Sequence, residues 1–255
     1  MPISSPIQAV EAFHLVFLRT LDTKYPRTGY VVKGGVNLRA WFGSMRYSED
    51  MDLDVVSGGV HELRDAVDRL IQAPAFLSLM RTQALTLVRS SRPKQTDTTQ
   101  RWKFEIRAPT SPVPLHTKVE FSRRGIDEDY ALEPVRQEIV RPYGIPAPTA
   151  NHYTAAAAIR QKIGALAGRR ETQARDIWDL EHLFRTTGAH AGPLPPRLKE
   201  AVPVALERIL EMPWGDFKAQ VVPFLEAAHQ PLYGSREAWD RIRELVVDRL
   251  LELVR

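Results

Sequence analysis

Four acidic residues crowd into the seven positions of the stretch SEDMDLD, namely Glu49, Asp50, Asp52 and Asp54. Acidic and apolar residues alternate strictly from Asp50 onward, and a period of two is typical of a half-buried β-strand. The apolar side chains would pack on one face, and the three aspartates would share the other. Carboxylates two residues apart on such a face have Cα atoms about 6 to 7 Å apart and can converge on one divalent cation.

An oxygen-rich pair of this kind suits Mg²⁺, which usually takes one or two protein carboxylates together with substrate phosphates and water. Two such ions about 4 Å apart can activate a hydroxyl group and stabilise an in-line displacement at phosphorus. The alternative is an edge strand with a solvated acidic face, because D-x-D patterns are common. Glu120 lies in the apolar run KVEF, and strand alternation predicts that it faces the same side as the aspartates.

A glycine pair precedes the acidic stretch, and this favours the metal-site interpretation. The β-rich run YVVK ends at Gly34 and Gly35, and a short helix is predicted directly after them. Backbone N–H groups at such a turn can hold phosphates. Cationic side chains flank the turn in the sequence, namely Lys33, Arg39 and Arg46.

The hydrophobic pattern predicts an α+β domain over residues 1–145 and a helical domain over residues 146–255. Strands are predicted at 30–33, 51–56, 84–89, 102–107 and 117–121, and helices at 7–21, 36–42 and 60–71, with a polar loop at 90–100. Ser5 and Pro6 supply a start for the first helix. The composition changes at RPYGIPAPT, which contains three prolines and a glycine. Five helices are predicted beyond it, at 155–166, 174–184, 196–210, 216–227 and 236–254.

Composition excludes several classes of protein. The 255 residues include no cysteine, which rules out disulfides, zinc–thiolate sites and a cysteine nucleophile. No apolar run approaches the roughly 18 to 20 residues that span a bilayer, and we expect a cytoplasmic chain that does not bind a membrane. The seven histidines show no metal-ligand spacing.

The net charge is only +4, but one segment is strongly basic. Between Arg81 and Arg124, ten cations (Arg81, Arg89, Arg92, Lys94, Arg101, Lys103, Arg107, Lys118, Arg123, Arg124) face three acids (Asp97, Glu105, Glu120). Such a surface attracts polyanions, although solvated strand-face arginines explain it equally well. Trp102, within this segment, is the candidate for stacking on an RNA base.

Two blocks of the sequence resemble the AbiEii/AbiGii-type nucleotidyltransferases, a branch of the DNA polymerase β-like superfamily. The first block is VKGG with a later leucine, followed by RYSEDMDLD. The second is KIGALAGR followed by RDIWDL, which is similar to the family pattern K-x-x-A-L-x-x-R and R-D-x-x-D-L. The resemblance covers roughly residues 30 to 185. It implies a polymerase β-like α+β domain, a mixed sheet flanked by helices, followed by an all-helical domain.

The resemblance also implies roles for individual residues. Asp50, Asp52 and Glu120 would be catalytic Mg²⁺ ligands, and Asp54 would be either a structural acid or an outer acid that does not bind the metal directly. The nucleotide would be held by Lys33, Gly34, Gly35, Arg46 and Ser48, although Ser48 could equally cap a turn. The helical domain would contribute catalytic Lys162 and Asp176 to the active-site cleft, with Lys33, Arg46 and Lys162 neutralising the leaving pyrophosphate.

Members of this family act as toxins of bacterial toxin–antitoxin pairs. The resemblance therefore implies a type IV-like toxin that transfers NMP from an NTP to RNA, with the 3′ end of tRNA as acceptor and an antitoxin protein as partner. Two alternatives remain open from the sequence. One is a nucleotidyltransferase that modifies a small molecule or a protein, and the other is a non-catalytic module that binds a partner.

Overall fold

The computed structural model describes residues 3–188 and 191–254, and the chain forms two compact units. The sheet unit comprises Met1–Gly43 and Tyr47–Tyr153, and the helical unit comprises Ser44–Arg46 and Thr154–Arg255. The predicted division at residue 145 lies too early, because a strand at Thr149–Tyr153 still belongs to the sheet. The short segment Ser44–Arg46 belongs to the helical unit, which the sequence did not predict.

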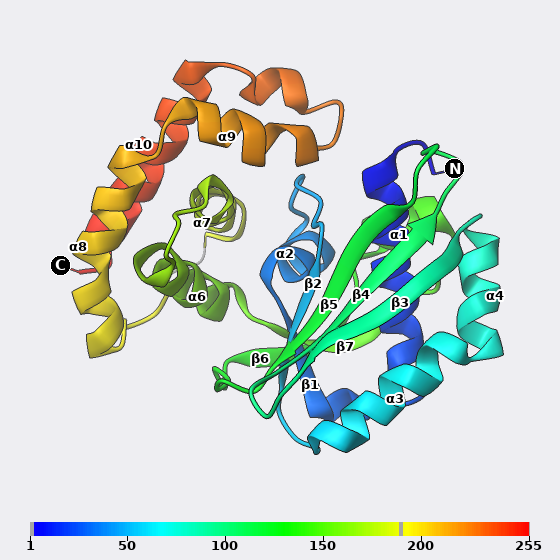
Figure 1. Ribbon diagram of the computed structural model, residues 1–255. Helices are drawn as coiled ribbons and strands as arrows, with labels where there is room; N and C mark the ends of the chain where they lie inside the picture. The colour runs from blue at the N-terminus through cyan, green and yellow to red at the C-terminus, as the bar shows by residue number, and fades with distance from the viewer. Residues whose placement is uncertain (1–2, 189–190, 255) are drawn as a thin grey trace. The chain divides into compact units, whose positions relative to one another are not determined.

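Seven strands form one mixed sheet in the order β3-β4-β5-β2-β1-β7-β6 (Figure 1). The pairs β1–β7 and β2–β5 are parallel, and the other neighbouring pairs are antiparallel. The strands are β1 (Tyr30–Lys33), β2 (Met51–Val55), β3 (Thr86–Gln95), β4 (Thr99–Arg107), β5 (Leu115–Ser122), β6 (Tyr130–Pro134) and β7 (Thr149–Tyr153).

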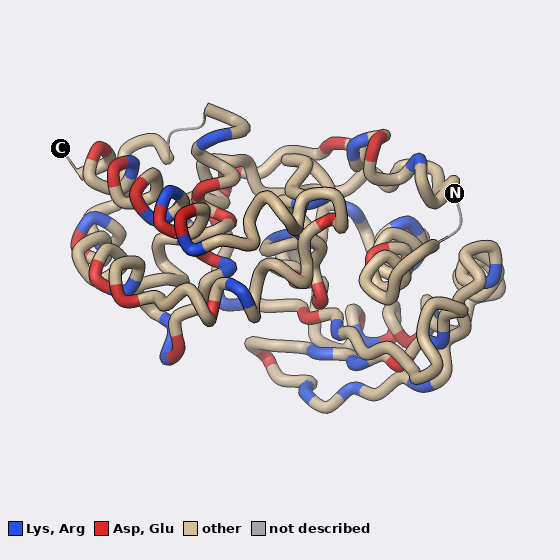
Figure 2. The backbone as a smooth tube through the Cα atoms, turned by 90° about the horizontal axis from the view of Figure 1, so that it is seen from above, with Lys and Arg blue, Asp and Glu red and all other residues tan. Residues whose placement is uncertain are grey.

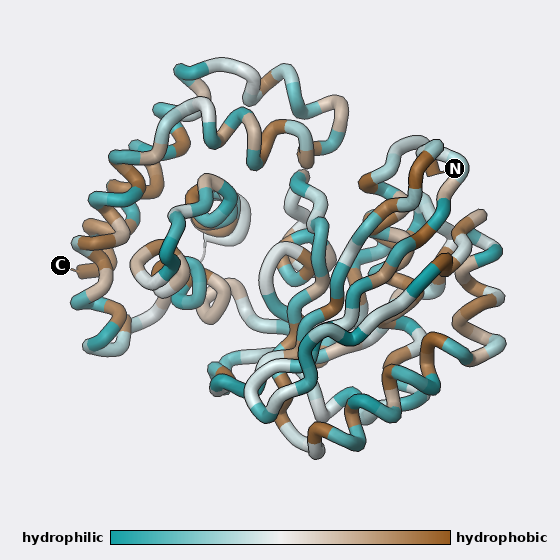
Figure 3. Tube along the Cα trace, viewed as in Figure 1, coloured by the Kyte–Doolittle hydropathy of each residue, from teal (hydrophilic) through white to brown (hydrophobic). Residues whose placement is uncertain are grey.

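Helices cover the apolar face of this sheet, and the alternation of β2 shows why. Met51 and Leu53 are fully buried on that face, together with Phe121 of β5 and Phe104 of β4. These residues share one core with α1, α3 and α4. Hydrophobic residues recur along α3 and α4 between hydrophilic ones, as an amphipathic helix requires (Figure 3). The polar face of the sheet therefore carries the acidic residues.

The helices of the sheet unit begin and end at recognisable signals. Ser5 accepts a hydrogen bond from the Gln8 N–H and Pro6 occupies the first turn of α1, as predicted. Gly43 has a left-handed backbone (φ 65°) and ends α2. The helices of this unit are α1 (Pro6–Leu21), α2 (Gly34–Phe42), α3 (Val60–Gln72), α4 (Pro74–Thr82) and α5 (Gln137–Val140), with 3₁₀ turns at Arg27–Gly29 and Arg141–Tyr143.

Two sequence predictions about the sheet are wrong. The polar stretch 90–100 is not a loop, because β3 and β4 run through most of it and join at a tight turn after Gln95. Strand β3 tolerates Pro93 and its register shifts because it lies at the edge of the sheet. The strands β6 and β7 were not predicted at all.

The helical unit contains the predicted helices, four of them with modest changes of boundary, whereas the helix predicted at 216–227 already ends at Gln220. They are α6 (Ala155–Gly168), α7 (Ala174–Thr187), α8 (Pro196–Glu211), α9 (Trp214–Gln220) and α10 (Arg236–Glu252), with 3₁₀ turns at Val222–Phe224 and Gln230–Tyr233. Aromatic rings form its core, where Phe217 stacks on Trp239 at 4.4 Å between ring centroids and Trp178 lies 6.1 Å from Phe217. No helix in the described residues is long and apolar enough to span a bilayer.

Candidate active site

Asp50, Asp52 and Glu120 lie together on the polar face of the sheet. Asp52 of β2 is paired in register with Glu120 of β5 on one side and with Lys33 of β1 on the other. Residues opposite each other on neighbouring strands project to the same face. The strand alternation that predicted a shared acidic face is confirmed, and Asp52 and Glu120 lie side by side on it.

Asp50 and Glu120 each form an ion pair with a cation of the sheet. Lys118 binds Asp50 twice, through Nζ to Oδ2 at 2.5 Å and through its backbone N–H to Oδ1 at 3.3 Å. Arg101 Nε donates to Glu120 Oε2 at 2.5 Å. All four side chains are between 20% and 34% exposed, so these pairs are reached by solvent and are open to exchange for another cation.

Asp52 differs from its neighbours because its carboxylate forms no hydrogen bond or ion pair with any described residue. Burial raises the pKa of this carboxyl, while the charges of Lys118 and Lys33 oppose the shift and those of Asp50 and Glu120 add to it. An enclosed carboxylate without a partner is unfavourable in an isolated protein. A bound divalent cation would supply the missing charge.

The glycine turn lies directly beside Asp52. Gly34 has φ 68°, which favours glycine, and a Cβ atom at this position would lie 3.4 Å from Asp52 Oδ2. Gly35 follows in the first turn of α2, where backbone N–H groups have no partner within the helix. The predicted phosphate-binding turn and the candidate metal ligands are therefore adjacent.

Lys33, at the start of this turn, is held by Asp54. Its Nζ donates to Asp54 Oδ1 at 2.5 Å, and the Tyr153 hydroxyl donates to Oδ2 at 2.8 Å. Asp54 is buried, whereas the side chain of Lys33 is 28% exposed. Burial raises the pKa of the Tyr153 hydroxyl, and the charge of Asp54 adds to the effect. Asp54 thus holds a lysine on the strand beside Asp52, and these contacts favour the structural alternative for this acid.

Two further predicted residues are occupied by other contacts. The Ser48 hydroxyl donates to the Asp50 backbone carbonyl at 2.7 Å, which is the turn-cap alternative rather than a phosphate contact. Arg39 does not flank the turn on the surface, because its Nε pairs with buried Glu11 at 2.7 Å in the interior. Glu49 is exposed.

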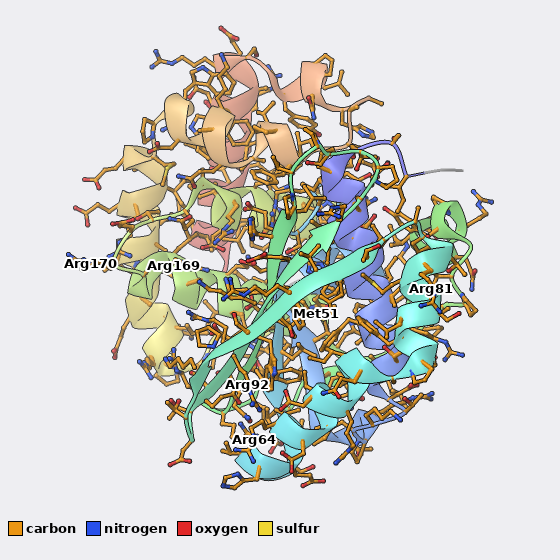
Figure 4. The ribbon with its side chains drawn as sticks, turned by 45° about the vertical axis from the view of Figure 1, so that its right-hand side comes forward. Met51, Arg64, Arg81, Arg92, Arg169 and Arg170 are labelled. Carbon is orange, nitrogen blue, oxygen red and sulfur yellow. The ribbon has the colours of Figure 1, made fainter. Side chains whose placement is uncertain are left out.

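The second sequence block forms a buried charge cluster inside the helical unit. Lys162 Nζ lies 2.8 Å from Asp176 Oδ1 and 2.5 Å from Asp179 Oδ2, and Arg46 binds both oxygens of Asp179 at 3.1 Å. Arg169, labelled in Figure 4, brings its Nε within 2.8 Å of Asp176 Oδ2. Both aspartates are fully buried, so the cluster is an internal ion-pair network of α6, α7 and the segment Ser44–Arg46.

The opposite charges of this cluster shift each other's pKa values toward the charged forms. Burial alone would raise the pKa of Asp179, but Arg46 and Lys162 outweigh it and hold the pKa below its usual value. Burial would likewise lower the pKa of Lys162, but Asp176 and Asp179 raise it. Lys162 and Asp179 therefore stay charged at neutral pH despite their burial.

The sequence profile of the family described as "Nucleotidyl transferase AbiEii toxin, Type IV TA system" matches residues 16–250 of this chain. The chain belongs to this AbiEii family. The match includes both sequence blocks and extends over most of the helical unit, well beyond the region in which the motifs themselves were identified.

Solved structures share the fold of this AbiEii-family chain at low sequence identity. MenT4, a nucleotidyltransferase toxin from Mycobacterium tuberculosis H37Rv, has a TM-score of 0.65 and 19% identity over 97% of this chain and 85% of its own. JHP933 from Helicobacter pylori has a TM-score of 0.59 and 16% identity over 99% of this chain and 96% of its own. A comparison with curated protein sequences gives no significant match.

Some side chains of this AbiEii-family chain contact the acidic residues of the site although the sequence motifs did not indicate them. Lys118 contacts Asp50, Arg101 contacts Glu120, and Tyr153 contacts Asp54. Asp179, by contrast, is the second aspartate of the RDIWDL block, and it contacts Lys162. Strand alternation could have indicated Lys118 and Arg101, because both project from the acidic face of the sheet. One prediction is wrong: Trp102 is buried on the opposite face, where its ring packs edge-on against Phe121, so it cannot stack on RNA.

The residues of the sheet unit fit a divalent cation. No three acidic or histidine side chains within the described part of the chain already converge on one point. Asp50 and Glu120 instead form ion pairs with Lys118 and Arg101. Mg²⁺ needs only one or two protein carboxylates, and Asp50 and Asp52 would supply these beside a turn that suits phosphate.

Proposed function

We propose that this AbiEii-family protein is a Mg²⁺-dependent nucleotidyltransferase that transfers NMP from an NTP to RNA, with the 3′ end of tRNA as the acceptor. The observation that carries the proposal is the half-buried Asp52 carboxylate, which forms no ion pair with any described residue and lies beside Glu120 and the glycine turn. A site with these groups suits phosphoryl chemistry and little else.

Asp50 and Asp52 would hold one Mg²⁺, and Glu120 would help to hold a second. The ions would supply Lewis-acid activation of the acceptor hydroxyl and would stabilise charge at phosphorus. The turn at Gly34 and Gly35 would bind the triphosphate through backbone N–H groups. These assignments place every metal and phosphate contact on residues of the sheet unit.

Neutralisation of the leaving pyrophosphate belongs to Lys33 in this proposal. Its ammonium group is partly exposed, and Asp54 and Tyr153 fix its position. Arg46, Lys162 and Asp176 were predicted to act in the active-site cleft, and that role stays a prediction. Their buried ion pairs support a structural role inside the helical unit instead.

The biological setting follows from the family and is proposed in the same way. The protein would act in the cytoplasm as a toxin of a type IV-like system, with a cognate antitoxin protein as its partner. A toxin that adds nucleotides to the 3′ ends of tRNA would block the attachment of amino acids and so stop translation.

The test is a transfer assay with Mg²⁺, each labelled NTP in turn and total tRNA. We expect label on RNA, and we expect Asp52→Asn to lower the initial rate by at least about 10³-fold. The control is Asp65→Asn, which removes an exposed aspartate from α3 and should leave the rate unchanged.

Three results would contradict the proposal. Wild-type rates in Asp52→Asn would remove the metal-site assignment. If label appears only on small molecules or on protein, the acceptor is one of these and not RNA. Absence of label with every NTP and every acceptor would favour a non-catalytic binding module.

A further inference from the structure

The polar face of the sheet continues beyond the acids and is rich in cations. On β4, Arg101 and Lys103 alternate with buried Trp102 and Phe104, so the two cations project to the same face as Asp52. Arg89 of the edge strand β3 projects to this face as well, because it lies opposite Glu105. Figure 2 shows that Lys and Arg positions recur along the strands of this unit.

A groove of about 410 Å³ lies on this face and begins at Asp50. Its polar lining comes from three neighbouring strands and includes the cations Arg89, Lys103 and Lys118, together with Ser91, His116 and the acid Glu105. Phe104 also lines the groove, but it is buried in the core, so it offers no exposed aromatic ring there. A ligand here would be recognised by charge and hydrogen bonds rather than by stacking.

The cations of the groove are incompletely neutralised. Lys103 and Lys118 stand directly opposite each other on β4 and β5, and like charges in this position destabilise a sheet. Asp50 neutralises Lys118, but neither Lys103 nor Arg89 forms an ion pair with any part of the chain that the structure describes. A bound anion would relieve the repulsion and occupy both side chains.

The sheet order places two cationic areas on opposite sides of the acids. Lys33 is the last residue of β1, and the glycine turn follows it. Both lie on one side of the acidic strand β2. The groove lies over β5, β4 and β3, on the other side. A nucleotidyltransferase must bring two anionic substrates to its metal ligands, and the groove lies where the second one would enter.

We propose that this groove binds the sugar–phosphate backbone of the acceptor RNA close to its 3′ end, with Arg89 and Lys103 neutralising successive phosphates. The inference rests on the proposed function and names the acceptor surface of that site. Because only the backbone is contacted, binding in the groove is expected to tolerate any base sequence.

The experiment measures binding of a fluorescent single-stranded RNA by anisotropy at several NaCl concentrations. The double variant Arg89→Ala and Lys103→Ala should weaken binding about tenfold. Each lost contact to a single strand should lower the slope of log K against log salt by about 0.7, so the two together should lower it by about 1.4. The charge-preserving variant Arg89→Lys and Lys103→Arg should retain binding and the slope.

A matched control removes two exposed arginines from the other side of the same unit. Arg69 and Arg81 lie on α3 and α4, which cover the opposite face of the sheet, and Arg81 is labelled in Figure 4. The double variant Arg69→Ala and Arg81→Ala loses the same charge and should bind RNA like the wild type. Equal losses in both double variants would overturn the groove and leave only non-specific attraction.

Two outcomes separate this inference from the proposed function. If the wild type transfers nucleotide but binds no RNA, the groove proposal fails and the transferase stands with another acceptor. If the groove variants lose RNA binding but the wild type transfers no nucleotide to RNA, the groove stands and the proposed reaction fails. Unchanged binding in Arg89→Ala with Lys103→Ala would overturn the proposal directly.

Discussion

The chain holds two clusters of carboxylates and cations that resemble each other in composition and differ in their surroundings. In the sheet unit, Asp50 and Glu120 pair with partly exposed cations, and Asp52 forms no ion pair with any residue that the structure describes. In the helical unit, Asp176 and Asp179 are fully buried, and each has two cationic partners. The carboxylates of the first cluster therefore have fewer cationic partners than those of the second.

This difference shows why residue type and spacing alone do not identify an active site. A surface pair contributes little to stability and can exchange its partner for a substrate or a metal ion. A buried pair cannot, because removal of one member leaves an uncompensated charge in the interior. The following changes are ordered by the size of their expected effect.

Asp52→Asn should separate the two clusters most clearly. The rate of transfer should fall by about 10³-fold or more, which corresponds to about 4 kcal/mol in the activation free energy. The free energy of unfolding should stay the same or increase, since an unfavourable enclosed charge is removed. Steady-state rates and urea denaturation measure both quantities. A marked loss of stability would give Asp52 a structural role.

Lys162→Ala should show the opposite pattern in the helical unit. Removal of the ammonium group takes one of its two cationic partners from each buried aspartate, while Arg169 remains at Asp176 and Arg46 at Asp179. The free energy of unfolding should therefore fall by about 3 kcal/mol. Denaturation followed by tryptophan fluorescence measures this loss. Lys199→Ala is the control, since Lys199 is exposed on α8 and should change the stability by less than about 0.5 kcal/mol. An unaltered melt together with abolished transfer would instead support a catalytic Lys162.

His14 makes the sheet unit sensitive to acid. Its Nε2 lies 2.8 Å from the Thr117 hydroxyl, which donates to the Glu49 carbonyl at the start of the acidic strand. Burial lowers its pKa from 6.5 to about 4. Between these values the unfolded chain takes up the proton first, so stability falls as pH drops from 6.5 to 4, by up to about 3 kcal/mol.

Denaturation curves at a series of pH values measure this dependence. His14→Gln keeps a donor at the same place and should flatten the curve over that interval. Identical pH dependence in the variant and the wild type would show that other groups cause the acid sensitivity.

Ser48→Ala should produce the smallest effect. The hydroxyl donates only to the Asp50 carbonyl, so its loss should cost about 1 kcal/mol of stability. The KM for the NTP should not change, because the turn cap does not contact phosphate. A rise in KM of tenfold or more would restore Ser48 as a nucleotide ligand.

Local patterns predicted much of the fold and of the acidic site. The alternation in SEDMDLD gave both the strand and its two faces, and the caps at Ser5 and Pro6 gave the first helix. Gly34 was identified because a turn between strand and helix needs its backbone freedom. These features depend on residues close together in the chain.

Features that depend on distant residues could not be predicted. Strand β7 is short and pairs in parallel with β1, more than a hundred residues away, and its own sequence TANHY gives little signal. Arg46 was expected beside phosphate, but its partner Asp179 stands 133 positions further along the chain. Trp102 is in a basic segment, yet the alternation of β4 turns it into the core.

Because Ser44–Arg46 belongs to the helical unit, the protein cannot be divided into its two units by a single cut. A chain cut after Tyr153 would keep these residues but lose every helix with which they pack, and the Met45 carbonyl would lose the Glu226 N–H that it accepts. The reciprocal fragment would lack the guanidinium that Asp179 binds. Neither half is a continuous stretch of sequence, so simple truncation or domain exchange should fail to give independent modules. Complementation of two co-expressed fragments is the more promising way to divide the chain.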